Sequence, residues 1–266
     1  DLHSFPTRRS SDLAKVVWVP GFVNRDGEPL PLIVQARTGG FNYATSDLAC
    51  VIDRVERLGA TLLVYVVGTP QSQHLQMVFK VAEMAGWLRP PARAEHVNFG
   101  SVLGPDRKML KSRSGDPVRF IELIDEAIER GVAAVADRST GIEGDELRAL
   151  GRSIGIGALK YAELSSDRIK DYVFDWDRML AFDGNTAPYL QYAHARISSV
   201  IQRAAEAGFH HSQEGHQFDS KLQHPTELAL IKKILDLPVE VARCSKDYGV
   251  HRLTTYAVEL ARMYHH

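Results

Sequence analysis

The stretch Thr61–Val67 (TLLVYVV) decides the fold, because it is a continuous run of apolar, strand-forming residues. Such a run is typical of a buried strand in a parallel sheet. Ser46–Leu58 before it and Gln71–Trp87 after it have the apolar spacing of helices, and Glu95–Phe99 resembles a second, short strand. This alternation predicts an α/β domain with a parallel sheet, whose ligands would bind at the loops that follow the two strands.

The flanking segments extend this prediction to two domains. Val16–Val19 and Leu32–Gln35 are strand-like and are separated by the Asp26–Gly27 turn. We expect residues 14–183 to form the α/β domain and residues 184–266 to form an all-α bundle. Asp171–Phe182 could be extended, and the later helices are expected at Val118–Arg130, Asp145–Leu164, Thr186–Ala207, Pro225–Leu235, Val239–Ser245 and Leu253–Tyr264.

Residues 1–13 (DLHSFPTRRSSDL) differ in residue pattern from the sequence that follows them. They contain no apolar periodicity and no apolar core of a secretory signal. We therefore interpret them as a foreign or disordered leader.

The amino-acid composition argues against several classes of protein. The 266 residues include 32 Lys and Arg against 33 Asp and Glu, so the formal net charge of -1 argues against a globally basic nucleic-acid binder. Cys50 and Cys244 form no CxxC or Cys/His cluster, so we expect no zinc, no other metal site and no disulfide scaffold. No apolar run approaches the roughly 18 residues of a membrane span, and we expect a cytoplasmic protein.

A first candidate site lies in GGFNYATSD at residues 39–47. Tyr43 and Asp47 are four residues apart, so on a helical turn they face the same way. A carboxylate beside a phenol ring could receive a planar cation, through bidentate pairing and an aromatic contact. The alternative is a helix cap at Ser46 or Asp47 with a packed tyrosine.

Two further candidate segments follow the predicted strands. Gln71 and His74 come directly after the buried strand, where they are either ligands or helix caps. His96, Phe99 and Gly100 belong to the next strand and its end. The loop after them contains Lys108, Lys111 and Arg113, whose charges could neutralise a transferring phosphate group, although a solvated surface loop is the alternative.

A fourth candidate opens the predicted bundle. Tyr189, Tyr192 and Arg196 recur at helical spacing after a cap at Asn185 or Thr186. They are either core and surface residues of an ordinary helix or a face that meets RNA through stacking and phosphate contacts.

Five blocks in this order resemble the arginyl-tRNA synthetases, a family of class I aminoacyl-tRNA synthetases. They are GGFNYATSDLA at 39–49, QSQHL at 71–75, HVNFGSVLG at 96–104, KMLKSRSGD at 108–116 and DGNTAPYLQYAHARI at 183–197. The resemblance covers nearly all of residues 14–266. It implies the C-terminal half of a class I Rossmann-like nucleotide-binding catalytic domain, followed by an all-α DALR-type anticodon-binding bundle.

The resemblance also implies a reaction and residue roles. Such enzymes activate L-arginine with ATP and Mg²⁺ and transfer it to the 3′ end of tRNA(Arg). Lys111, with Lys108 as the alternative, would stabilise the pyrophosphate leaving group, with Arg113 in the same loop. The resemblance places three residues at the substrate arginine: Tyr43, Asp47 and Gln71. It places five at ATP: His74, His96, Phe99, Gly100 and Lys111. It places three at the tRNA: Tyr189, Tyr192 and Arg196.

The sequence departs from the family pattern in two ways. Leu110 stands where the KMSKS loop has serine, and no His-x-Gly-His motif occurs in the chain. We therefore expect a fragment, inactive alone, of a monomeric parent enzyme. The alternative is a non-catalytic tRNA-binding module derived from a class I synthetase. Cysteinyl-tRNA synthetases rank lower, because they carry zinc ligands and this chain has no cysteine cluster.

Overall fold

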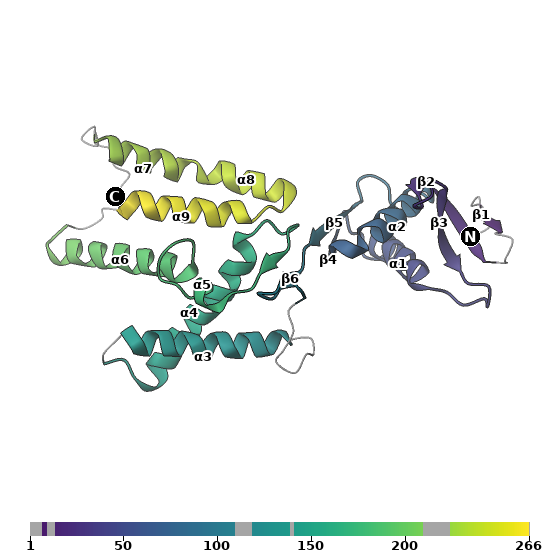
Figure 1. Cartoon of the computed structure of the whole chain (residues 1–266). Coiled ribbons are helices and arrows are strands. Elements are labelled where there is room, and N and C mark those ends of the chain that lie inside the picture. Colours follow the sequence, from purple (N-terminus) through teal and green to yellow (C-terminus); the bar gives the residue numbers. More distant parts are fainter. Residues whose placement is uncertain (1–6, 10–13, 110–118, 139–140, 210–223, 266) are drawn as a thin grey trace. The chain divides into compact units, whose positions relative to one another are not determined.

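The chain divides into two compact units, residues 1–100 and residues 101–266 (Figure 1). The computed structural model describes residues 7–9, 14–109, 119–138, 141–209 and 224–265. The predicted boundary at residues 183 and 184 lies inside the second unit, because α4 (Gly144–Ser165) packs against helices on both sides of that boundary. Among the described residues, no helix is both long enough and apolar enough to cross a membrane.

The first unit contains an antiparallel and a parallel sheet. β2 (Lys15–Val23) and β3 (Pro29–Gln35) form the predicted hairpin, and β1 (Thr7–Arg9) pairs with β2 on its other side. β1 thus lies in the segment for which we expected a leader. β4 (Leu62–Gly68) and β5 (Arg93–Phe99) pair in parallel, as the sequence predicts.

Two helices join these strands. α1 (Tyr43–Ile52) continues as a π-helical turn at Asp53–Arg57, and α2 (Ser72–Met84) follows a 3-10 turn at Thr69–Gln71. Both helices contribute to one core with the sheets. Its members include Val17, Val34, Leu48, Val51, Leu63, Leu75, Val78 and Val81.

The predicted cap of the first helix is wrong. α1 begins at Tyr43, three residues before Ser46, and Asn42 is its N-cap. The Asn42 side-chain oxygen accepts the Thr45 backbone N–H at 3.3 Å, which satisfies one of the free donors of the first turn. Asp47 therefore lies one turn inside the helix and makes no cap.

β4 is not buried on both faces, which corrects the sequence prediction. Leu63 is buried in the core, whereas Leu62, Val64 and Val66 are 38%, 43% and 66% exposed. Successive side chains of a strand point to opposite faces, so these three share one face. Within the described part of the chain, that face has little packed against it.

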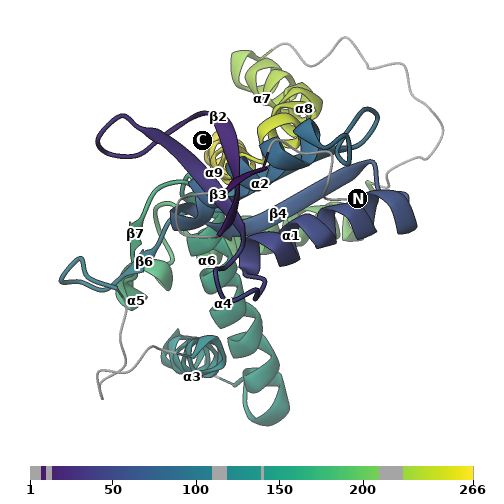
Figure 2. The ribbon, with the colours of Figure 1, turned by 90° about the vertical axis from the view of Figure 1, so that its right-hand side faces the viewer.

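The second unit is mainly helical. β6 (Val102–Leu103) pairs in parallel with β7 (Tyr172–Val173), and α3 (Phe120–Arg138) packs along α4 (Gly144–Ser165). Figure 2 looks along α3 and shows α4 crossing beside it. The remaining helices are α5 (Trp176–Met179), α6 (Ala187–Glu206), α7 (Pro225–Leu235), α8 (Leu237–Asp247) and α9 (His251–His265).

Glycines set the close approach of α3 and α4. A Cβ on Gly155 would overlap the Ala127 carbonyl oxygen, and a Cβ on Gly131 would overlap that of Gly151. Neither glycine has a positive φ, so the requirement is space and not backbone conformation.

The aromatic segment 171–182 is only partly extended. It contains the two residues of β7 and then the short helix α5, capped by the Asp175 side chain, which accepts the Arg178 backbone N–H at 3.1 Å. Trp176 packs edge-on against Phe174, and the Arg130 guanidinium of α3 lies 5.1 Å from the Trp176 ring centroid. The segment thus joins α5 to the α3–α4 pair.

Candidate functional site

A carboxylate, an imidazole and a phenol meet where α1 lies against α2. The Asp47 Oδ2 and His74 Nε2 atoms are 2.6 Å apart, and the Tyr43 and His74 ring centroids are 4.7 Å apart at a tilt of 58°. Tyr43 and Asp47 lie one turn apart on α1, as their spacing predicts. His74 lies in the first turn of α2, which follows the carboxyl end of β4.

The sequence around this group explains its position. The Asn42 side-chain amide donates to the Ile33 carbonyl oxygen at 2.9 Å, and the Thr45 hydroxyl donates to the Val34 carbonyl oxygen. These two bonds fix the first turn of α1 to β3. On α2, Leu75 and Val78, one and four residues after His74, are buried in the core.

The carboxylate and the phenol of this group are accessible. The Asp47 side chain is 34% exposed, and Tyr43 is 69% exposed. Burial raises the pKa of the Tyr65 phenol, and Arg54 opposes this rise. The negative charge of Asp47 adds to it, so the charge of Asp47 acts on a neighbouring group. A partly exposed carboxylate beside an exposed aromatic ring matches the planar-cation receptor that the sequence indicates.

Gln71 is not a side-chain cap of α2, although it occupies the N-cap position. It is exposed at the end of the 3-10 turn, and the Ser72 hydroxyl donates to the Thr69 carbonyl oxygen instead, at 2.7 Å. His74 is engaged with Asp47 and is not a cap either. The capping alternative for both residues is therefore wrong.

Polar and aromatic groups gather at the carboxyl ends of β4 and β5. The His96 Nε2 lies 2.9 Å from the Val67 carbonyl oxygen, and the Thr69 hydroxyl donates to the Phe99 carbonyl oxygen at 3.0 Å. Phe99 is half-exposed, and Gly100 ends the unit. Three of the five residues predicted at ATP thus lie in or directly after β5. Of these, Phe99 and Gly100 are at its carboxyl end, and the His96 ring reaches the carboxyl end of β4, where ligands of parallel sheets bind.

Of the predicted cationic loop, the structure describes only the beginning. Lys108 is exposed in the second unit, where its backbone N–H donates to the Asp106 side chain at 3.1 Å and its carbonyl accepts the Gly104 N–H at 2.8 Å. Lys111 and Arg113 lie outside the described residues. Their predicted role stays a prediction.

The three residues predicted to meet tRNA converge on one side chain that the sequence reasoning missed. The His265 ring of α9 lies 5.9 Å from the Tyr189 ring and 6.2 Å from the Tyr192 ring, between centroids. The Arg196 guanidinium Nη1 lies 3.4 Å from the His265 Nδ1. Tyr192 and Arg196 are exposed, so this cluster presents an aromatic and a cationic surface.

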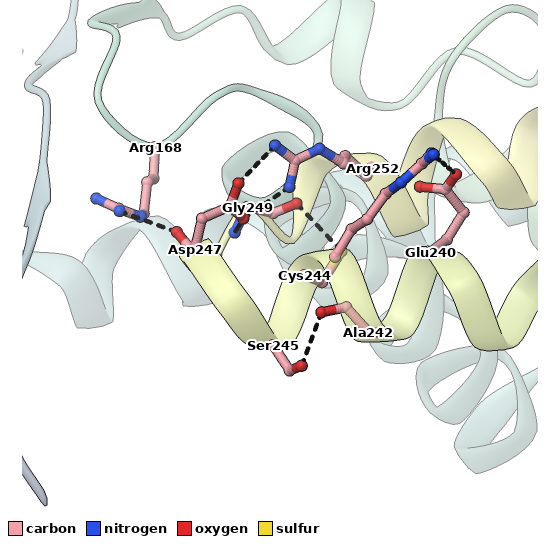
Figure 3. A network of polar contacts seen from close by, with 9 residues as sticks. Arg168, Glu240, Ala242, Cys244, Ser245, Asp247, Gly249 and Arg252 are labelled. Carbon is pink, nitrogen blue, oxygen red and sulfur yellow. Dashed lines mark hydrogen bonds and ion pairs between the residues drawn. The ribbon is translucent and has the colours of Figure 1, made fainter.

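A polar network holds the α8–α9 corner (Figure 3). Arg252 pairs with both carboxylate oxygens of Asp247 at 2.7 Å, and the Cys244 thiol donates to the Gly249 carbonyl oxygen at 3.3 Å. The Arg168 guanidinium donates to the Asp247 carbonyl oxygen at 3.2 Å, which ties the corner to the segment before β7. The Arg252 hydrogen bonds and the Gly249 N–H lower the pKa of Asp247 to about 2. No motif in the sequence signals this network.

The family of the chain follows from two matches. The family model "tRNA synthetases class I (R), catalytic domain" matches residues 5–176, and the "DALR anticodon binding domain" matches residues 190–266. The first defines the chain as a class I aminoacyl-tRNA synthetase polypeptide. It belongs to the arginyl-tRNA synthetase family, and the fold class inferred from the sequence is confirmed.

Individual relatives agree with this assignment. The chain is 46% identical to the arginine–tRNA ligase of Thermobifida fusca over 96% of its own length and 43% of that protein. It is 43% identical to the arginine–tRNA ligase of Nostoc sp., over 94% of its own length and 43% of that protein. It thus spans less than half the length of these curated relatives.

Solved structures show the same fold. The arginyl-tRNA synthetase of Plasmodium falciparum matches with a TM-score of 0.77 at 27% identity, over 97% of this chain and 42% of that one. The Thermus thermophilus arginyl-tRNA synthetase matches with a TM-score of 0.81 at 22% identity, over 99% and 48%. The latter is a likeness of fold alone.

Proposed function

We propose that this chain provides the arginine-binding, part of the ATP-binding and the anticodon-binding surfaces of an arginine–tRNA ligase that acts in the cytoplasm. The observation that carries the proposal is that the Asp47 carboxylate and the Tyr43 ring, one turn apart on α1, both contact His74 in the first turn of the helix that follows the carboxyl end of β4. A guanidinium is the planar cation that pairs in this way with a carboxylate and stacks on a phenol.

The chemistry of the proposed reaction suits the residue types present. The arginine carboxylate attacks the α-phosphorus of ATP, which is bound with Mg²⁺, and pyrophosphate leaves. Because the attacking carboxylate is already ionised, the step needs positioned cations and no general base. Lys108, Lys111 and Arg113 are the proposed cations, and His96, Phe99 and Gly100 are proposed to face ATP.

The second proposed surface receives the tRNA. Tyr189 and Tyr192 offer rings on which bases can stack, and Arg196 offers a charge for a phosphate. Their convergence on His265 supports this role, because it gathers the three side chains where α6 and α9 meet.

A chimera tests the proposal. Residues 14–266 of this chain replace the matching segment of the full-length Thermobifida fusca relative, and charging of tRNA(Arg) with radiolabelled arginine is measured. We expect charging with arginine and none with lysine, with the unmodified relative as the reference. A folded chimera that binds tRNA(Arg) without charging it would favour a tRNA-binding module instead.

A further inference from the structure

We propose that His74 is a positioning residue of the arginine receptor, which holds the Asp47 carboxylate in the plane that a guanidinium requires. This inference rests on the proposed function. It moves His74 from the ATP side, where the resemblance placed it, to the amino-acid side. It also makes His74 a determinant of the choice between arginine and a cation of another shape.

The first support is the hydrogen bond itself. The His74 Nε2 lies 2.6 Å from the Asp47 Oδ2, within the range of a strong bond to a carboxylate. A carboxylate is an acceptor only, so the imidazole donates through Nε2–H. One of the two acceptor positions of Oδ2 is thereby filled, and each carboxylate oxygen keeps an acceptor position for one of two parallel donors.

The second support is the difference in burial between the two partners. The His74 side chain is 14% exposed, whereas that of Asp47 is 34% exposed. The imidazole thus lies on the protein side of the carboxylate, and the ligand side stays open. A histidine placed in this way orients the acid without blocking it.

The third support is that the imidazole itself is held in place. The Tyr43 ring packs against it at 4.7 Å between centroids, and Tyr43 is at the same time largely exposed. Leu75, the residue after His74, is buried in the core, and α1 is fixed to β3 through Asn42 and Thr45. Hence the bond joins two anchored helices, and its direction is determined by the fold.

A fixed carboxylate plane favours one shape of cation. A guanidinium has planar, forked donors and pairs with a carboxylate through two parallel bonds, whereas an ammonium is a compact point charge with rotating donors. Loss of the orienting bond should therefore weaken the binding of arginine more than the binding of lysine. A histidine with only a structural role would leave this ratio unchanged.

Two substitutions separate the bond from the ring contact. His74→Phe keeps a ring for Tyr43 but cannot donate to Asp47, whereas His74→Gln loses the ring and keeps an N–H donor. His194→Phe, at an exposed position of α6, is the matched control. Affinities of the 266-residue chain for L-arginine and L-lysine are measured by NMR titration, with folding checked from the amide spectrum.

We expect His74→Phe to lower arginine affinity about tenfold, the size of a lost hydrogen bond to a charged group, and to lower lysine affinity less than threefold. His74→Gln should restore arginine affinity to within about threefold of the original, and His194→Phe should change neither. In the unsubstituted chain, the His74 ring nitrogen signals should shift along the same arginine binding curve, a readout that holds even where His74→Phe unfolds.

The outcomes are distinguishable. Binding of arginine that His74→Phe leaves unchanged, an equal loss for both cations, or His74 signals that do not respond to arginine would each overturn the positioning role while the proposed function stands. A folded, unsubstituted chain that shows no arginine binding would contradict the arginine receptor, and the role of His74 with it.

Discussion

Gly155 of α4 lies so close to Ala127 of α3 that a Cβ on the glycine would overlap the alanine carbonyl oxygen. The two helices therefore pack backbone against backbone, with Gly131 and Gly151 repeating the same contact one turn away. α3 begins at Phe120, shortly after the segment that contains Lys111 and Arg113. The glycine contacts thus determine how closely α3 packs along α4.

Gly155→Ala should destabilise the second unit. An alanine favours a helix by about 1 kcal/mol over glycine, but the overlap with backbone atoms forces the helices apart at a cost of about 1–3 kcal/mol. We expect a net lower melting temperature by circular dichroism. Ser153→Ala, on the exposed face of the same helix, is the control and should leave it nearly unchanged. A melting temperature raised by Gly155→Ala would show that the helices can separate freely.

Asp47→Asn should weaken arginine binding. The substitution removes the negative charge and retains an oxygen that can accept from His74, so the lost binding energy reports the charge. We expect about 2 kcal/mol or more, or roughly 30-fold in the arginine KM of the chimera. Asp26→Asn, in the exposed hairpin turn, is the matched control. An unchanged KM would remove Asp47 from the arginine site.

Asp247 should make the α8–α9 corner sensitive to acid. Its pKa is lowered from 3.8 to about 2 by Arg252 and the Gly249 N–H, so its contribution is complete above about pH 4. As the pH falls from 4 to 2 the carboxylate is protonated and that stability is lost. Arg252→Gln should raise the Asp247 pKa in a carboxyl NMR titration, and Arg243→Gln, at the Glu240 ion pair, should not. An Asp247 titration near 3.8 in the unsubstituted chain would contradict the network.

Arg196→Ala should weaken tRNA binding through the loss of one phosphate contact. The slope of log affinity against log salt should fall by about one, and the loss should be similar for different tRNAs. A gel-shift series at several salt concentrations measures both. Arg57→Ala, in the first unit and paired with Asp53, is the control. An unaltered salt slope would place Arg196 outside the tRNA surface.

The fold was predictable where the signal is local. The apolar run of β4 and the helical periodicity of α2 to α4 and of α6 to α9 depend on neighbours within a few residues. The short helix α5 was not predicted, because it lies in a segment that we expected to be extended. The start of α1 was not predictable, because the Asn42 and Thr45 side chains also bond to carbonyls of β3, nine and eleven residues earlier. The exposed face of β4 was missed because an apolar run carries no information on whether both faces are covered.

The candidate site shows the same limit. Tyr43 and Asp47 could be paired from their spacing on one helix turn, which is a local property. His74 is 27 positions from Asp47, and His265 is 69 positions from Arg196, so each pair exists only once the helices have packed. Sequence blocks can supply the members of a site, but not which member contacts which.

The exposed side chains of β4 have a practical consequence for handling the protein. Leu62, Val64 and Val66 form an apolar, uncharged row on one face of a strand of high β-propensity, and an exposed apolar patch of this kind favours association between chains. Light scattering of the purified chain should therefore rise steeply with concentration. A charged residue at Val66, the most exposed of the three, is the change that would keep it dispersed.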